Sequence, residues 1–217
     1  MLIAPNIHCV PGVIANVFVL VDPDGLTLVA AGLPYNQRRI LAYLQTLGYP
    51  PQAVRRILVT HADRDHIGSL AALQARTGAR VYASPLEAEA LAAGRETRRL
   101  RVGAGWRALL WLLGRLLFVK IQPAAADERL AEGQELPVLG GLRVLATPGH
   151  TPGHLSFFAA GPGVLFAGYS LRTLGGRLRI SAGPNTADEA LAQASAQRQF
   201  ALRPRLICTG HGPAVRL

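Results

Sequence analysis

Four side chains that can bind a metal lie within six residues of one another in one polar segment: His61, Asp63, Asp65 and His66. Imidazole and carboxylate groups are the ligands that suit zinc, iron and manganese. A lone histidine is more often a hydrogen-bonded polar residue, but two histidines and two aspartates at this spacing are difficult to explain as an ordinary surface. The segment therefore predicts a metal site.

Two further segments carry histidine among glycine and proline residues. Residues 147–154 contain His150 and His154, and residues 209–213 contain His211, so five of the six histidines fall in three segments. Glycine and proline permit a tight turn and a close approach of the backbone to an ion. We expect His150 and His211 to join the metal site, and we interpret His154 and His8 as hydrogen-bonded polar residues.

The first half of the chain has the pattern of strands and helices that would position the first segment. Residues 17–21 and 27–31 are apolar runs joined by Asp22-Pro23-Asp24-Gly25, which is typical of a hairpin. Residues 36–48 have apolar positions at helical spacing, and residues 54–60 form an apolar run that ends directly before His61. We also expect helices over residues 70–77 and 85–94 and a strand over residues 79–83.

The second half repeats this order. We expect strands over residues 136–146, 155–167, 178–181 and 206–209 and a helix over residues 186–200. Strands followed by helices, twice over, predict an α/β protein with two mixed sheets sandwiched between helices. A length of 217 residues with 50% hydrophobic residues fits a single domain over residues 1–217.

An insertion at about residues 96–120 departs from this pattern. Residues 106–118 are expected to form a helix that is apolar on most sides, and such a helix must be buried, cover a ligand, pack on a partner or lie at a membrane interface. Core packing or self-association as a homodimer is one interpretation, and a lid over an apolar substrate is the other. The run is too short and too charged to span a bilayer.

Composition narrows the surroundings and partners of the chain. The absence of a basic leader before an apolar run, and of any stretch of about 20 apolar residues, predicts a cytoplasmic protein with no transmembrane segment. Cys9 and Cys208 lack the spacing of a disulfide framework or a thiolate zinc site and are expected to be reduced. The formal net charge of +10 attracts anions. Because the basic residues are scattered, a small substrate is favoured over nucleic acid.

The three histidine segments together resemble the pattern of the metallo-β-lactamase superfamily: H-x-H-x-D-H, a Gly-His loop, a Gly-Asp segment and a C-terminal Gly-His-Gly. The resemblance covers nearly the whole chain and implies an αββα four-layer sandwich of two mixed β-sheets flanked by helices, with the metal site at one edge. It also implies two ligand sets, which are His61, Asp63 and His150 for the first metal and Asp65, His66 and His211 for the second.

Three positions depart from the pattern of this superfamily. Asp63 stands where the second histidine of the motif is expected, Tyr169 where the bridging aspartate is expected, and Ala30 where many members carry an aspartate that supports the metal loops. Each implied ligand set therefore has two histidines and one carboxylate. We expect the site to bind one or two zinc ions, and iron or manganese is the alternative. The Tyr169 phenol either binds a metal or a developing oxyanion, or its ring fills the space between the metals.

The resemblance implies a metal-dependent hydrolase similar to glyoxalase II and the lactonases of the superfamily. A metal-activated water would attack a small ester, thioester, lactone or amide, with a hydrophobic or acyl substrate favoured by the apolar insertion. Asp65 would orient the water, and Tyr169 or a metal would stabilise the oxyanion. Two alternatives stay open. One is a mononuclear non-haem iron oxidase or dioxygenase on the same fold, and the other is a catalytically degenerate binding protein.

Overall fold

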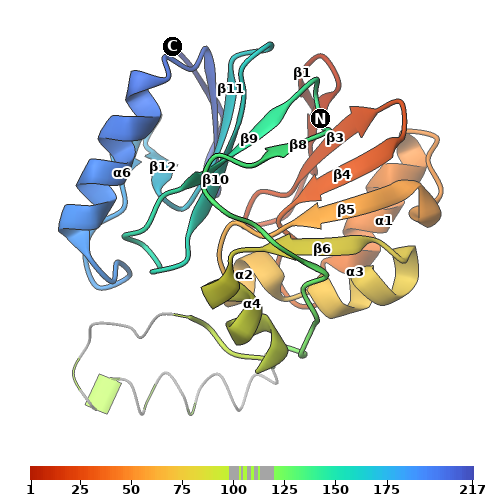
Figure 1. Cartoon of the computed structure of the whole chain (residues 1–217). Coiled ribbons are helices and arrows are strands. Elements are labelled where there is room, and N and C mark those ends of the chain that lie inside the picture. Colours follow the sequence, from red (N-terminus) through yellow and green to blue (C-terminus); the bar gives the residue numbers. More distant parts are fainter. Residues whose placement is uncertain (98–102, 104, 107–108, 110–111, 113–119) are drawn as a thin grey trace.

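The computed structural model describes residues 1–97, 103, 105–106, 109, 112 and 120–217. The expected apolar helix over residues 106–118, with the homodimer or substrate lid assigned to it, lies mostly outside the described residues. Within the described part of the chain, no helix is both long enough and apolar enough to cross a membrane. Most of the strands form two large sheets that face each other, with helices outside them (Figure 1).

The first sheet has seven strands in chain order, antiparallel from β1 to β4 and parallel from β4 to β7. Its strands are β1 (Leu2–Ala4), β2 (Ile7–Cys9), β3 (Phe18–Asp22), β4 (Gly25–Val29), β5 (Val54–Leu58), β6 (Arg80–Ala83) and β7 (Glu128–Arg129). The expected hairpin joins β3 to β4, with Asp22 opposite Gly25. Gly25 has φ 132°, which residues with a side chain rarely adopt, so the turn requires glycine.

The second sheet has six strands in the order β15-β14-β11-β10-β9-β8, of which only β14 and β11 are parallel neighbours. Its strands are β8 (Glu135–Leu136), β9 (Leu142–Ala146), β10 (Leu155–Ala159), β11 (Val164–Gly168), β14 (Leu206–Thr209) and β15 (Val215–Arg216). The expected strand regions over residues 136–146 and 155–167 each divide into two strands, because turns containing glycine interrupt them. β12 (Leu171–Leu174) and β13 (Arg177–Ile180) form a separate two-stranded sheet.

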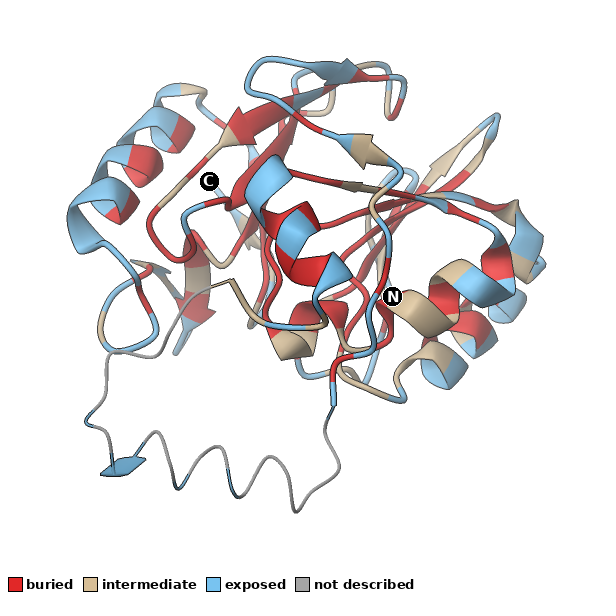
Figure 2. Ribbon diagram, turned by 60° about the horizontal axis from the view of Figure 1, so that its bottom comes forward, coloured by how far each residue is buried: buried red, intermediate tan, exposed pale blue. Residues whose placement is uncertain are grey.

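Helices complete the outer layers. α1 (Gln37–Thr46), α3 (Leu70–Thr77) and α4 (Pro85–Ala92), with the short 3₁₀ helix η1 (Pro51–Ala53), pack on the first sheet, and α6 (Glu189–Ala201) packs on the second. Figure 2 shows that the buried residues of these helices face the sheets and that their exposed residues face outward. The arrangement confirms the αββα sandwich of two mixed sheets.

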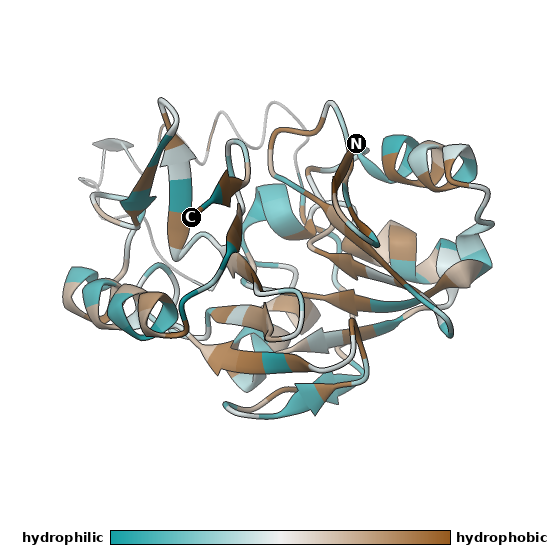
Figure 3. Ribbon diagram, turned by 90° about the horizontal axis from the view of Figure 1, so that it is seen from above, coloured by the Kyte–Doolittle hydropathy of each residue, from teal (hydrophilic) through white to brown (hydrophobic). Residues whose placement is uncertain are grey.

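The core between the sheets is built from every second residue of the facing strands. Phe18 and Leu20 of β3 point into it, whereas Val19 between them faces the helices, as the two-residue period of a strand requires. Phe166 of β11 meets Phe18 edge to face, with ring centroids 5.5 Å apart. Figure 3 shows brown, hydrophobic stretches along several strands, with teal, hydrophilic residues among them. This aromatic pair therefore joins the two sheets directly.

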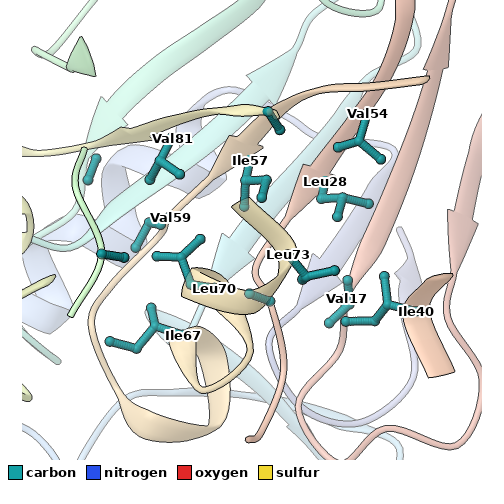
Figure 4. Close-up of a cluster of buried hydrophobic side chains, with 14 of the residues drawn as sticks. Val17, Leu28, Ile40, Val54, Ile57, Val59, Ile67, Leu70, Leu73 and Val81 are labelled. Atoms are coloured by element: carbon teal, nitrogen blue, oxygen red, sulfur yellow. The ribbon is translucent and has the colours of Figure 1, made fainter. Parts of the chain in front are cut away.

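A second core cluster lies between the first sheet and its helices (Figure 4). Ile40 of α1 and Leu70 and Leu73 of α3 pack toward the strands, where Leu28 and Ile57 face them. All five side chains are almost completely buried. The helical spacing of apolar residues in α1 and α3 is thus explained by this face of the sheet.

Replacing Phe166 by alanine should lower the free energy of unfolding by about 3–5 kcal/mol, because it removes a fully buried ring and leaves a cavity between the sheets. Urea denaturation followed by circular dichroism measures the change. Phe200→Ala is the matched control, since Phe200 is 39% exposed on α6 and should cost much less. Equal losses in the two variants would contradict this assignment of the central core.

Candidate metal centre

Loops from both sheets meet at one edge of the sandwich. The loop after β5 runs into α2 (Arg64–Ile67), the loop after β9 leads to β10, and the last loop follows β14. Leu155 N donates a hydrogen bond to Thr60 O at 2.8 Å, which ties the start of β10 in the second sheet to the loop that follows β5 in the first. These loops and α2 carry all six expected ligands: His61, Asp63, Asp65, His66, His150 and His211.

The first donor group consists of His61, Asp63 and His150, and it is buried. His150 Nε2 lies 3.0 Å from Asp63 Oδ2, and His61 Nε2 lies 3.8 Å from the same oxygen. The relative exposures of the three residues are 0%, 3% and 0%. The fold therefore brings two distant loops into contact around one carboxylate.

The second donor group consists of Asp65, His66 and His211 and is more open. His211 Nε2 lies 3.1 Å from Asp65 Oδ2 and 3.3 Å from His66 Nε2. His66 Nε2 lies 3.8 Å from Asp65 Oδ2. The side chains of His211 and Asp65 are 23% and 29% exposed, so a small molecule can approach this group from solvent.

The spacing of the donor atoms fits a metal ion in both groups. Zinc binds imidazole nitrogen and carboxylate oxygen at about 2.0–2.2 Å in a tetrahedral arrangement, which places neighbouring donor atoms about 3.4 Å apart. The donor atoms of each group all lie within 4.8 Å of one another, and the measured pairs lie between 3.0 and 3.8 Å. Each group can therefore hold an ion.

Hydroxyl groups contact two of the histidine rings at Nδ1, the nitrogen on the side away from the donor group. Thr60 Oγ1 lies 2.9 Å from His61 Nδ1, and Ser181 Oγ lies 3.3 Å from His150 Nδ1. Because each Nδ1 is occupied, Nε2 is the nitrogen that faces the donor group. Outer partners of this kind fix the tautomer and the orientation of metal-binding imidazoles.

The ring of His66 lacks such a partner. Its Nδ1 is buried and has no hydrogen-bond partner in the described part of the chain. Ala31 N donates to His66 O at 2.7 Å, so position 30 lies close to the His66 backbone. Ala30, with φ 68°, offers no polar group there, whereas the resemblance implies an aspartate.

Burial and neighbouring charges keep the second group in the form that binds a metal. Burial favours protonation of Asp65, but its hydrogen bond with His211 and the charges of His66 and His211 outweigh burial, so the pKa of Asp65 lies below its usual value. Burial lowers the pKa of His66 to about 4. At neutral pH Asp65 is therefore an anion and His66 is neutral, which are the states that metal binding requires.

The ring of Tyr169 contacts histidines of both donor groups. It stacks on His150 with ring centroids 4.1 Å apart and an interplanar angle of 17°. It also meets His211 edge-on, with centroids 5.1 Å apart. Tyr169 directly follows Gly168, the last residue of β11, so the end of this strand fixes the ring in place.

His154 supports these loops through both of its ring nitrogens. Nδ1 lies 2.8 Å from Thr147 Oγ1, and Nε2 accepts a hydrogen bond from Tyr169 N at 3.0 Å. The ring stacks on His61 with centroids 5.0 Å apart. Burial lowers the pKa of His154 well below its usual value, so the ring is neutral at pH 7. With both nitrogens engaged by the protein, His154 is not placed as a ligand.

Two supporting residues lie outside the histidine segments and were not among the predicted site residues. Asn16 Nδ2 donates to Thr209 O at 2.8 Å and to Gly212 O at 2.7 Å, so its amide holds the turn that carries His211. Glu87 of α4 is the second residue of this kind. Neither position has a local sequence signal for such a role, because each acts on a loop that is distant in the chain.

The sequence profile of the metallo-beta-lactamase superfamily matches residues 10–211. The probable metallo-hydrolase YflN of Bacillus subtilis is 26% identical over 223 residues, which covers 96% of this chain and 84% of that protein. A hydroxyacylglutathione hydrolase of Stenotrophomonas maltophilia is 33% identical over 165 residues, which covers 75% of this chain and 48% of the enzyme. The match to that enzyme thus spans about half of its length.

Solved structures show the same fold. A metallo-beta-lactamase family protein from Thermus thermophilus has a TM-score of 0.75 at 24% identity, covering 98% of this chain and 75% of that one. A metallo-beta-lactamase from Cronobacter sakazakii with a HARLDQ motif has a TM-score of 0.70 at 26% identity, covering 98% and 77%. Its motif shares histidine, alanine and aspartate with His61, Ala62 and Asp65, and it also lacks histidine at the third position.

Thr60→Val should weaken zinc binding at the first donor group about 10–100-fold, because His61 loses the hydroxyl that orients its ring. Calorimetric titration of the metal-free protein with zinc measures the change. Thr27→Val is the matched control, since Thr27 is also buried in the first sheet but its hydroxyl has no partner among the described residues. Equal affinities of the two variants would rule out this role of Thr60.

Proposed function

This chain belongs to the metallo-beta-lactamase superfamily, and we propose that it is a metal-dependent hydrolase of a small ester, thioester, lactone or amide. The observation that carries the proposal is the pair of donor groups, each with two imidazoles and one carboxylate at metal-binding distances. Zinc held by these groups would lower the pKa of a bound water to about 7 and polarise the substrate carbonyl.

Asp65 is the residue that we assign to the nucleophilic water. Its carboxylate is ionised, partly exposed and hydrogen-bonded to His211, so its position is fixed while one side faces solvent. An oriented carboxylate of this kind can accept a hydrogen bond from water and hold it for attack. His66 and His211 complete the group around it as imidazole donors.

We propose that Tyr169 acts first through its ring, as a wall between the two donor groups. Its stacking on His150 and its edge contact with His211 support this role. The ring occupies the place where the superfamily pattern has a bridging aspartate, so the two groups share no carboxylate. In the alternative role, the phenol donates a hydrogen bond to the oxyanion. Substitutions at Tyr169 can distinguish the two roles.

A thioester is the substrate class that we would test first. The hydroxyacylglutathione hydrolase of Stenotrophomonas maltophilia, at 33% identity, supports this choice, although this chain corresponds to about half of that enzyme. The net charge of +10 favours a substrate that carries a negative charge. Esters, lactones and amides of similar size form the rest of the substrate panel.

The donor chemistry also supports a second candidate function, oxidation at a mononuclear iron centre. Two histidines and one carboxylate are the ligands of many non-haem iron oxygenases, and each donor group has this composition. Bound iron with consumption of oxygen would favour this function over hydrolysis. If the chain is instead a binding protein without catalytic activity, both donor groups should bind metal weakly.

Elemental analysis of protein purified without added metal tests the hydrolase proposal directly. We expect about one or two equivalents of zinc per chain, with a lower content in Asp63→Ala because the first group loses its carboxylate. Asp127→Ala, which removes a carboxylate outside the site, should keep the wild-type content. Iron in place of zinc would favour oxidation, and no metal in any protein, even after reconstitution, would contradict both enzyme functions.

Substitutions at Tyr169 separate its two proposed roles. Tyr169→Phe keeps the ring and should retain metal content and kcat close to those of the wild type. Tyr169→Leu removes the aromatic stack on His150 and should change the metal content. If Tyr169→Phe instead lowers kcat about 100-fold with metal content unchanged, the hydroxyl is an oxyanion donor and the ring assignment is wrong. Steady-state kinetics with the thioester, together with metal analysis, measure both quantities.

A further inference from the structure

Glu87 is a buried carboxylate that contacts two loops of the metal centre and belongs to neither donor group. It lies on α4 and has 0% exposure. Oε2 accepts a hydrogen bond from the backbone N–H of Ala62 at 2.8 Å, and Oε1 accepts one from Thr151 Oγ1 at 2.6 Å. Ala62 stands between two members of the first donor group, and Thr151 directly follows the third.

Among the described residues, the side-chain and loop hydrogen-bond donors to the Glu87 carboxylate are all neutral. Besides Ala62 and Thr151, Thr97 Oγ1 donates to Oε2. Burial raises the pKa of Glu87, and the nearby charge of Asp63 adds to this shift. A buried carboxylate is unfavourable unless hydrogen bonds or a cation compensate it. A metal ion in the first donor group would therefore also relieve the crowding of the two carboxylates.

The local sequence would assign Glu87 a different task. Ser84-Pro85-Leu86-Glu87 has the S-x-x-E pattern of a capping box, in which the glutamate bonds back to the cap residue. Ser84 does cap the helix, since its hydroxyl accepts from Glu87 N at 3.3 Å. The Glu87 carboxylate, however, is directed to the loops. Glu87 therefore forms hydrogen bonds with Ala62 and Thr151 of two loops instead of the usual bond to the cap residue of its own helix.

Gly153 allows the second loop to approach this carboxylate. A Cβ atom at position 153 would lie 2.7 Å from Ser84 Oγ and 2.9 Å from Glu87 Oε1. Real Cβ atoms essentially never approach other atoms this closely, so a side chain at this position would push against the side chains of Ser84 and Glu87. The absence of a side chain there lets Thr151 reach Glu87.

We infer that Glu87 is a positioning residue that holds the loop of His61 and Asp63 in register with the loop of His150, one carboxylate oxygen to each loop. Glu87 contacts no reacting atom and acts through the ligands. The inference deepens the proposed function and depends on only one part of it, namely that the first donor group binds a metal.

The test compares Glu87→Gln with Glu89→Gln, which removes the same charge from an exposed site on the same helix. The glutamine amide nitrogen cannot accept a hydrogen bond, so one of the two loops loses its contact. Zinc affinity is measured by competition with a chromophoric chelator, and the geometry of the site by the absorption spectrum of the cobalt-substituted protein. Glu87→Gln should bind zinc about 10–100-fold more weakly and change the cobalt spectrum, whereas Glu89→Gln should match the wild type.

A second variant, Thr151→Val, removes one hydrogen-bond donor and keeps the Glu87 carboxylate. Its zinc affinity should fall less than that of Glu87→Gln, and the two changes together should weaken binding by less than the product of their separate effects, because they break the same contact. If Glu87→Gln fails to fold, Thr151→Val alone decides, and wild-type affinity and spectrum in that variant would overturn the inference.

The outcomes distinguish the inference from the proposed function. If Glu87→Gln keeps the wild-type zinc affinity and cobalt spectrum and only its metal-free form is less stable, Glu87 is a structural residue and the inference is wrong. A wild-type protein that binds zinc but hydrolyses no member of the substrate panel contradicts the hydrolase proposal and leaves the inference standing. A wild-type protein that binds no zinc overturns both.

Discussion

The structure at the site edge depends on burying ionisable side chains while giving their polar atoms partners. Removing a carboxylate or an imidazole from water is costly unless hydrogen bonds or ions replace the lost solvation. Six such residues at this edge have exposures of 3% or less: His61, Asp63, His66, Glu87, His150 and His154. Their partners come from both sheets and from α4, so this requirement links elements that are far apart in the chain.

Because the partners come from different layers, the site and the sandwich depend on each other. Leu155 bonds to Thr60 across the two sheets, and Asn16, in the loop between β2 and β3, holds the turn after β14. Phe18 and Phe166 pack between the sheets and fix their separation. A shift of one sheet against the other would therefore strain the donor groups, and this is why a large apolar core accompanies a small polar centre.

Much of the fold and of the donor set could be predicted from the sequence because their signals are local. The His61–His66 segment directly follows an apolar strand, and the Asp22–Gly25 turn has hairpin chemistry. The short strands β1, β2, β7 and β15 had no such signal, since two or three residues show no periodicity. The roles of Asn16 and Glu87 arise only when distant loops meet, and the Ser84-x-x-Glu87 pattern indicated a helix cap instead.

The positions of the aspartates differ from the superfamily pattern, and this difference affects how the two donor groups would bind metal ions. In the superfamily pattern one aspartate lies between the two metals and couples them. Here Asp63 belongs to the first group, Asp65 belongs to the second, and the Tyr169 ring contacts a histidine of each group. Each group has two histidines and one carboxylate of its own, so we expect each to bind an ion without an ion in the other. The first group is buried, and Glu87 accepts hydrogen bonds from the residues beside its members. The second, with Asp65 and His211 reaching solvent, is the one that a substrate can contact.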